Sequence, residues 1–317
     1  MNILVTGSAG FIGFHTSKAL LERGDKVIGV DSFTQYYDVS LKESRNKILL
    51  QYPNYSFHKI SIADKEALFD LFKKEKPDKV INLAAQPGVR YSLENPFIYE
   101  ESNLKGFLNI LEACREFKVN QLVYASSSSV YGNNKKVPFS ESDRVDEPIS
   151  LYAATKKANE EMAFAYHHLF GINCFGLRFF TVYGPYGRPD MAIFTFTKDI
   201  SEGRTIKLFN NGKMKRDFTY VSDIVAGILS AVDKCNGCEV INLARGETKD
   251  LIEFVGEIEK SLGVKAKKEL LPLQKGDLIE TNADISKAKR LLGYNPKVSI
   301  AEGIKNFADW FKEYYKK

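Results

Sequence analysis

Cysteine and histidine are scarce in this chain of 317 residues, which contains four of each. So few cysteines in a chain of this length do not form the disulfide framework of a small secreted domain. Cys235 and Cys238 have the spacing of a CxxC pair, but the zinc site that such a pair suggests needs two further ligands, and no second pair follows. Asn236-Gly237 between them is typical of a turn. The sequence therefore predicts no metal site.

Long apolar runs and blocks of like charge are also missing. No stretch is long enough to cross a bilayer, and the start of the chain has neither the basic nor the apolar region of a signal peptide. The net charge is +5, but the basic residues are scattered among acidic ones and form no stripe for nucleic acid. We therefore expect a cytoplasmic protein that binds neither membranes nor nucleic acid, and an anionic small substrate would suit its charge.

The first half of the chain alternates short apolar segments with helical patterns. Strands are predicted at residues 2–6, 26–31, 55–60, 79–83, 121–126 and 173–178, and helices at residues 12–23, 41–52, 64–74, 96–117 and 151–170. Short apolar runs of this kind suit strands that are buried on both faces of a parallel sheet. The alternation predicts an α/β fold of the Rossmann type, a doubly wound parallel sheet.

The pattern becomes less regular after about residue 180, where Gly184, Pro185, Gly187 and Pro189 mark a loop. We expect residues 1–180 to form the large domain and residues 181–317 a smaller α/β substrate domain. A helix and a buried strand within residues 223–245 return to the large domain in this prediction, so the two domains are interleaved. The part from residue 250 onward is expected to be mostly helical.

A glycine-rich segment, Thr6-Gly-Ser-Ala-Gly-Phe-Ile-Gly13, joins the first predicted strand to the first helix. Glycines at this point allow a tight turn and let the backbone reach a pyrophosphate, which the helix N-terminus attracts. Asp31 ends the second strand, where a carboxylate can accept hydrogen bonds from ribose hydroxyls and repel a 2′-phosphate. The sequence therefore predicts an NAD site rather than an NADP site; the alternative is a glycine-rich turn without a ligand.

Tyr152 and Lys156 lie one turn apart on a predicted helix and so share a face. An ammonium close to a phenol favours the phenolate, which can act as a general base toward a sugar hydroxyl. The serine run 126–129 ends the fifth predicted strand, where ligands of such sheets bind. The alternatives are an ordinary amphipathic helix and a polar turn.

These motifs resemble the extended short-chain dehydrogenase/reductase family over essentially the whole chain. The glycine loop, residues 82–85, the serine run, Tyr152 with Lys156, residues 216–221 and residues 276–277 carry the resemblance. Within the family the chain is most similar to UDP-glucuronate 4-epimerases, through residues 38–42, 85–93 and 177–192. The last of these stretches is the most specific.

The resemblance implies an isomerase that epimerises a UDP-sugar at C4, with UDP-glucuronate and UDP-galacturonate as the pair. Tyr152 would take the proton of the 4-hydroxyl during a reversible hydride transfer to NAD, through a transient 4-keto sugar. Ser127 would bind the reacting oxygen, and Lys156 would orient the nicotinamide ribose and tune Tyr152. A homodimer through the helices 96–117 and 151–170 is also implied.

The motifs and the resemblance together imply a set of binding residues beyond the catalytic Ser127, Tyr152 and Lys156. Cofactor contacts are expected from Gly7, Gly10, Phe11, Ile12, Gly13, Asp31, Ser32, Ile62, Leu83, Ala84, Ala85, Asn103, Tyr152, Lys156 and Phe179. Substrate contacts are expected from Gln86, Arg90, Ser128, Ser129, Thr181, Arg188, Ile206, Leu208, Arg216 and Asp277. For any single arginine, ordinary surface charge is the alternative.

The neighbours of Ser127 favour epimerisation over related reactions. Similar dehydratases and decarboxylases have acidic residues where this chain has Ser128 and Ser129. The rivals are a UDP-glucose/galactose 4-epimerase, a UDP-glucuronate decarboxylase and a non-catalytic protein that binds NAD or a nucleotide sugar. Two positions depart from the family pattern, because Ser61 stands where many relatives have Asp, and Gln274 where galactose epimerases have Arg.

Overall fold

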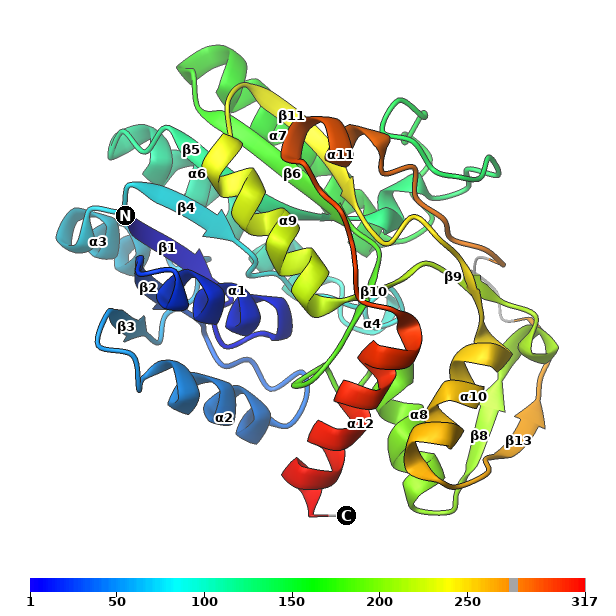
Figure 1. The fold of residues 1–317 in the computed structure, drawn as a ribbon. Coiled ribbons are helices and arrows are strands. Elements are labelled where there is room, and N and C mark those ends of the chain that lie inside the picture. The colour runs from blue at the N-terminus through cyan, green and yellow to red at the C-terminus, as the bar shows by residue number, and fades with distance from the viewer. Residues whose placement is uncertain (274–278, 317) are drawn as a thin grey trace.

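A seven-stranded parallel sheet organises the computed structural model, which describes residues 1–273 and 279–316 (Figure 1). Its strand order is β11-β6-β5-β4-β1-β2-β3. The strands are β1 (Asn2–Thr6), β2 (Lys26–Val30), β3 (Tyr55–His58), β4 (Lys79–Asn82), β5 (Gln121–Ser127), β6 (Asn173–Phe179) and β11 (Cys238–Leu243). The order reverses between β1 and β4, which is where ligands of doubly wound sheets bind. The predicted α/β fold with a Rossmann-type sheet is confirmed.

Helices cover both faces of the sheet because its central strands carry apolar side chains on both sides. Val5 and Val123 face one core, together with apolar side chains of α1 (Phe11–Glu22), α2 (Val39–Leu49), α9 (Val221–Lys234) and α11 (Ser286–Leu292). Leu4 and Leu122 face the other, against α3 (Lys65–Glu75), α6 (Gly106–Glu116) and α7 (Leu151–Phe170). Each fully buried side chain of this kind contributes about 1.5–3 kcal/mol, so the sheet gives the site a rigid base.

A smaller lobe packs beside the carboxyl ends of the strands. It contains α8 (Ala192–Ser201), β8 (Thr205–Leu208), α10 (Leu251–Leu262), β13 (Lys267–Leu270) and α12 (Ile300–Tyr315). β8 and β13 pair in parallel, and the core holds Phe254, Phe307 and Phe311. Short strand pairs, β7 (Thr181–Tyr183) with β10 (Phe218–Tyr220) and β9 (Lys215–Arg216) with β12 (Lys249–Asp250), lie where the lobes meet.

The predicted helix at residues 96–117 is continuous but not uniform. It consists of α5 (Phe97–Tyr99), a π-helix (Glu100–Lys105) and α6. The strands β7, β9, β10, β12 and β13 and the helix α4 (Tyr91–Glu94) were not predicted. Most of these elements are so short that they give no periodic signal.

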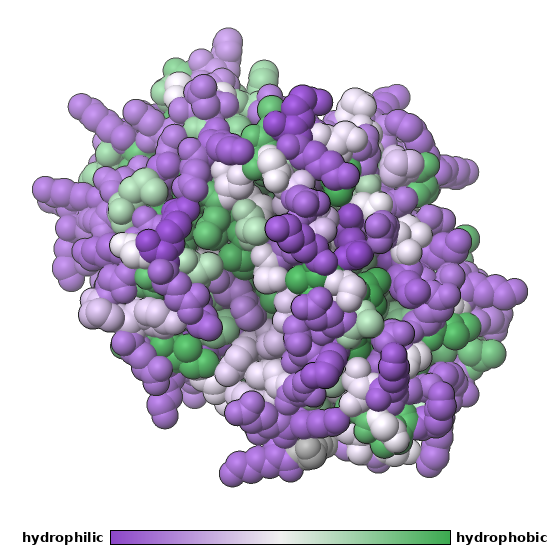
Figure 2. All heavy atoms as spheres, viewed as in Figure 1, coloured by the Kyte–Doolittle hydropathy of each residue, from purple (hydrophilic) through white to green (hydrophobic). Residues whose placement is uncertain are grey.

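No helix in the described part of the chain is both long enough and apolar enough to span a membrane. The face in Figure 2 carries mostly hydrophilic side chains, with hydrophobic ones in scattered patches. The cytoplasmic location remains a prediction from the sequence.

Candidate active site

The glycine loop between β1 and α1 is closely packed. A Cβ on Gly7, which has a φ of +68°, would lie 2.8 Å from the backbone nitrogen of Ala84, and a Cβ on Gly13 would lie 2.0 Å from the Gly7 carbonyl oxygen. The N-cap of α1, Gly10, makes no side-chain capping bond, so the amides of the first turn remain available to an anion. This cradle fits the pyrophosphate of a dinucleotide.

Asp31 follows β2, and its side chain is only 6% exposed. Its Oδ1 accepts a 2.8 Å hydrogen bond from the backbone of Phe33 and lies 3.3 Å from the ammonium of Lys42. Lys42 also donates to the Thr34 hydroxyl at 3.1 Å. The carboxylate expected to recognise a ribose is therefore held in place by a buried cation, which the sequence did not reveal.

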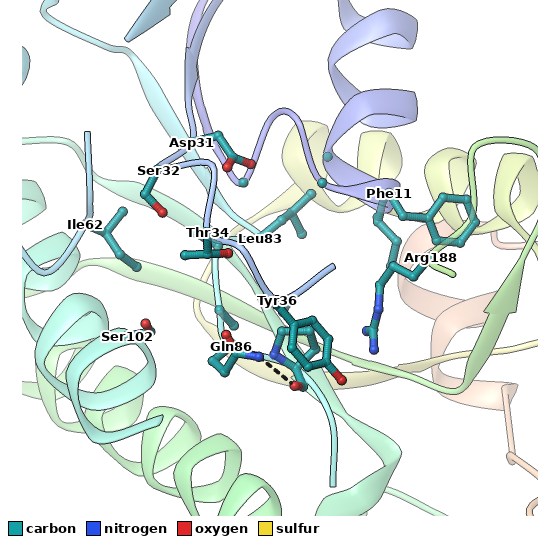
Figure 3. Close-up of a pocket in the computed structure, with 18 of the residues that line it drawn as sticks. Phe11, Asp31, Ser32, Thr34, Tyr36, Ile62, Leu83, Gln86, Ser102 and Arg188 are labelled. Atoms are coloured by element: carbon teal, nitrogen blue, oxygen red, sulfur yellow. Dashed lines mark hydrogen bonds between the residues drawn. The ribbon is translucent and has the colours of Figure 1, made fainter. Parts of the chain in front are cut away.

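One pocket of about 250 Å³ joins the glycine loop to the proposed catalytic residues. Of the site residues predicted from the sequence, those that line this pocket are Gly7, Gly10, Phe11, Ile12, Gly13, Asp31, Ser32, Ile62, Leu83, Ala84, Ala85, Gln86, Ser127, Tyr152, Lys156, Phe179 and Arg188. Figure 3 shows Asp31 and Ser32 on one side of this pocket and Arg188 and Tyr36 on another. The structure thus brings most of the predicted site together.

Helix α7 holds Tyr152 and Lys156 at its first turns, directly after the cap Ser150, whose hydroxyl accepts from the Ala153 amide at 3.1 Å. Lys156 is 2% exposed and donates a 2.9 Å hydrogen bond to the carbonyl of Ala125 in β5. The ammonium thereby ties the helix to the strand that ends in Ser127.

Burial controls the ionisation of both residues. It lowers the pKa of Lys156 to about 8 and raises the pKa of Tyr152 above its usual value. A hydrogen bond with Ser127 and the charge of Arg188 act in the opposite direction on the Tyr152 pKa. From the sequence, we expected the Lys156 ammonium to lower the Tyr152 pKa. In the structure, this ammonium instead donates its hydrogen bond to the Ala125 carbonyl.

The serine run forms a short relay. The Ser129 amide and hydroxyl both donate to the Ser127 hydroxyl oxygen, at 3.2 and 2.9 Å. With its oxygen accepting these bonds, Ser127 can direct its own proton to the Tyr152 phenol or to a bound oxygen. Ser128 and Ser129 begin a 3₁₀ turn (Ser128–Tyr131) and do not line the pocket. Ser129 therefore contributes to the site through its hydrogen bonds to Ser127.

Arg188 lines the pocket and faces two other groups. Its guanidinium forms a two-pronged ion pair with Asp190, with distances of 3.0 and 2.5 Å. Tyr36 donates to the same carboxylate at 3.1 Å, and its ring lies 5.9 Å from the guanidinium carbon. Burial and the adjacent Asp190 raise the Tyr36 pKa to about 12, so its hydroxyl stays a donor at neutral pH.

Several predicted residues lie outside the pocket lining. Asn103, in the π-helix, is buried and bonds the Gln86 backbone and Thr155. Arg90 lies over the Phe209 ring at 5.8 Å. Thr181 begins β7, and Arg216 donates to the carbonyls of Lys215 and Ile279.

Ile206 and Leu208 are also outside the lining, because the alternation of β8 turns them into the core of the small lobe. They are 1% and 0% exposed, so their side chains are enclosed by that core. The predicted contact Asp277 and the divergent Gln274 lie outside the described residues.

The sequence missed other residues that line the pocket. These are Val30, Thr34, Tyr36, Tyr37, Lys42, Ile60, Ser61, Pro87, Ser102, Ala125, Ser126, Phe180, Val182 and Met191. Tyr36 and Tyr37 could have been found from their place in the loop that follows Asp31, the residue expected to bind the ribose. Ser61 remains in the lining although it departs from the family pattern.

Comparisons with known proteins agree with this geometry. The model of the NAD dependent epimerase/dehydratase family matches residues 3–244. An uncharacterized protein of Methanocaldococcus jannaschii is 56% identical over 98% of this chain and 96% of its own length. UDP-glucuronate 4-epimerase 4 of Arabidopsis thaliana is 49% identical over 99% of this chain and 76% of its own length.

A solved structure is also similar. The UDP-glucuronic acid 4-epimerase of Bacillus cereus, in complex with UDP-glucuronic acid and NAD, superposes with a TM-score of 0.93 at 37% identity. That match covers 99% of this chain and 100% of the other. The chain therefore belongs to the NAD dependent epimerase/dehydratase family, and NAD is its cofactor.

Proposed function

We propose that the protein interconverts UDP-glucuronate and UDP-galacturonate by epimerisation at C4. The observation that carries the proposal is one pocket in which Tyr152, Ser127 and Arg188 all meet the glycine loop. The identities to UDP-glucuronate 4-epimerases from Arabidopsis thaliana and Bacillus cereus support the same substrate.

The chemistry of the residues supports a reversible oxidation of the 4-hydroxyl. The Tyr152 phenolate accepts the hydroxyl proton and later returns it, while Ser127 donates a hydrogen bond to the same oxygen. Bound NAD supplies a hydride acceptor that is regenerated in every turnover. Because the reaction has no net redox change, no second oxidant or reductant is needed.

The charge of Arg188 supports a sugar acid as the substrate. Its guanidinium already holds a carboxylate, that of Asp190, in the two-pronged geometry that arginine prefers. A substrate carboxylate would bind the same donors by displacing Asp190 from them. Ser128 and Ser129 provide no general acid beside the reacting carbon, which disfavours dehydration and decarboxylation relative to epimerisation.

The experiment is to incubate purified protein with UDP-glucuronate without added NAD, and to identify products by NMR, with Tyr152→Phe as the control. UDP-galacturonate without release of CO2 is the expected result. A UDP-pentose product would show that the protein is a UDP-glucuronate decarboxylase instead. Turnover of UDP-glucose alone would show that it is a UDP-glucose/galactose 4-epimerase. NAD uptake with no turnover of any UDP-sugar would favour a non-catalytic binding protein.

A homodimer through α6 and α7 is part of the proposal. These helices expose apolar side chains that a monomer would leave in water, with Leu108, Phe164 and Leu169 at 41%, 61% and 65% exposed. Phe164→Asp/Leu169→Asp should halve the mass measured by light scattering. The control Leu50→Asp, at an exposed position (57%) that follows α2, should leave the mass unchanged.

A further inference from the structure

A buried ion pair joins α7, the helix that carries Tyr152 and Lys156, to the strand β6. Glu160 of α7 and Arg178 of β6 have side chains that are 4% and 2% exposed. Arg178 donates through Nε and one terminal nitrogen to the two oxygens of Glu160, both at 2.8 Å. This is the two-pronged geometry that fixes orientation as well as distance.

The pair also holds the strand that carries Ser127. The hydroxyl of Ser126 donates a 2.6 Å hydrogen bond to Glu160, next to the position where β5 ends at Ser127. The guanidinium carbon of Arg178 lies 4.9 Å from the centre of the ring of Tyr131, two residues after the serine run. Glu160 thus joins α7, β5 and β6 at one point.

The position of Glu160 on α7 relates it to the reacting groups. It follows Lys156 by one helical turn and Tyr152 by two, which is about 6 and 12 Å along the axis. Lys156 is fixed to the same strand one residue earlier, at the Ala125 carbonyl. Two successive residues of β5 are therefore bound by two successive turns of α7.

Stability alone does not account for this arrangement. Removing two charges from water costs several kcal/mol per ion, and apolar replacements of buried pairs are often neutral or stabilising. Arg178 also compensates the charge of Glu160, so that neither Tyr152 nor Lys156 lies near an unbalanced carboxylate.

We propose that Glu160 and Arg178 are positioning residues, a clamp that sets the distance between the Tyr152–Lys156 helix and the Ser127 strand and in which Arg178 balances the charge of Glu160. The proposal rests on the catalytic roles of Tyr152, Lys156 and Ser127 given above. It concerns how these groups are held, whichever UDP-sugar is the substrate.

The test separates geometry from charge. Glu160→Gln removes the carboxylate and leaves a buried cation, whereas Glu160→Gln/Arg178→Gln removes both charges. A remaining cation stabilises the Tyr152 phenolate and disfavours the Lys156 ammonium, so both pKa values should fall. At axial distances of about 6 Å for Lys156 and 12 Å for Tyr152, and an effective dielectric near 20, the shifts are roughly two and one pH units.

The other charged or titratable groups near the clamp are unchanged in all variants. They are Tyr99 and Arg188 beside Tyr152, Lys157 and Tyr124 beside Glu160, and Tyr131 and Glu141 beside Arg178. A difference between the single and double variants therefore reports the charge of the clamp itself.

Two readouts are measured for each protein. The first is the pH profile of kcat/KM with the UDP-sugar that the parent converts. The second is the ultraviolet difference between each protein and its Tyr152→Phe counterpart, which follows the ionisation of that phenol and needs no turnover. If the parent converted no UDP-sugar, the proposed function would fail, and the spectral titration would still decide the role of the clamp.

We expect Glu160→Gln to lower kcat by at least about tenfold, as loss of positioning does, and to move both readouts to lower pH. The double variant should also lose kcat, but its profiles should return to those of the parent. Equal shifts in both variants, or an unchanged Glu160→Gln protein, would overturn the proposal.

A further variant covers the case in which Glu160→Gln does not fold. Ser126→Ala releases β5 from the clamp without changing any charge. It should lower kcat while leaving the phenol titration in place, and Ser126→Thr, which keeps the hydroxyl, should restore part of the rate. Full activity of Ser126→Ala would contradict the proposed link between α7 and the Ser127 strand.

Discussion

The ammonium of Lys42 lies 3.3 Å from the Oδ1 atom of Asp31, and both side chains line the cofactor pocket while being almost completely buried. Asp31 is the residue expected to accept hydrogen bonds from the ribose hydroxyls of NAD and to repel the 2′-phosphate of NADP. Lys42 could therefore bind a 2′-phosphate, but Asp31 neutralises its charge and repels that phosphate.

Asp31→Ser should therefore change the choice of cofactor. Without the carboxylate, Lys42 and the Thr34 hydroxyl are left as donors for a 2′-phosphate, and we expect the affinity ratio of NADP to NAD to rise at least about tenfold. Calorimetric titration with both dinucleotides measures this ratio. Asp31→Ser/Lys42→Met is the matched control and should lose the gain; if it kept the gain, the phosphate would be bound by other groups.

Tyr152→Phe should remove the proposed general base and leave the pocket otherwise intact. Loss of such a group costs roughly 10²–10⁴-fold in kcat. The affinity for NAD, measured by calorimetry, should stay within about twofold, because the ring is retained. Substantial remaining turnover would place the base elsewhere.

Lys156 should set an alkaline limit to activity. Because burial lowers its pKa to about 8, the ammonium is present below that pH and is lost as the pH rises through it. The rate profile with the converted UDP-sugar should therefore decline above about pH 8. Lys156→Arg keeps its charge throughout the measurable range, so whatever activity it retains should show no such decline.

Gly13→Ala should weaken both folding and cofactor binding. The new methyl group would lie 2.0 Å from the Gly7 carbonyl oxygen, so α1 or the loop must move. We expect a loss of unfolding free energy of about 1–3 kcal/mol, measured in urea, together with weaker NAD binding.

Gly256→Ala in α10 is the control for that variant. A Cβ there meets no atom within 4 Å, and the backbone is helical. It should stabilise the protein by about 0.5–1 kcal/mol, because alanine is the better helix former. Equal destabilisation by both variants would show that the close packing at Gly13 is not the cause.

Asp217→Asn should destabilise the junction between the lobes. Burial raises the Asp217 pKa to about 6, and the two carboxylate oxygens accept from the backbone amides of Arg245, Gly246 and Ala283, at 2.9, 3.0 and 3.2 Å. An asparagine has only one acceptor oxygen, so at least one amide loses its partner. We expect a loss of about 1–3 kcal/mol in urea unfolding, whereas no change would mean that water replaces the lost acceptor.

The sequence predicted those parts of the site that follow from local rules. The strand before Gly7 and the helix after it located the cofactor loop, and spacing alone placed Tyr152 and Lys156 on one face of α7. Lys42 was not assigned because its role depends on how the loop after β2 folds back toward Asp31.

The same limit applies to residues whose neighbours lie far apart in sequence. The Glu160–Arg178 pair joins a helix to a strand 18 residues away; Arg178 lies in the motif at residues 177–192, but nothing in that motif indicates Glu160 as its partner. Ile206 and Leu208 were expected near a ligand, but the direction of their side chains was decided by the packing of the small lobe. Local pattern located the chemistry, and tertiary contacts decided which neighbours support it.

The return of β11 to the edge of the large sheet, beside β6, limits how the chain can be cut. The polypeptide leaves the sheet after β6, builds part of the small lobe, and comes back through α9 before leaving again. A fragment that ends after β6 would expose an unpaired strand edge and the apolar surface that α9 covers. Neither lobe can therefore be expressed as a continuous fragment of the chain. Insertions or fusion partners should instead be placed at surface turns such as Gly203, where a Cβ would have no atom within 4 Å.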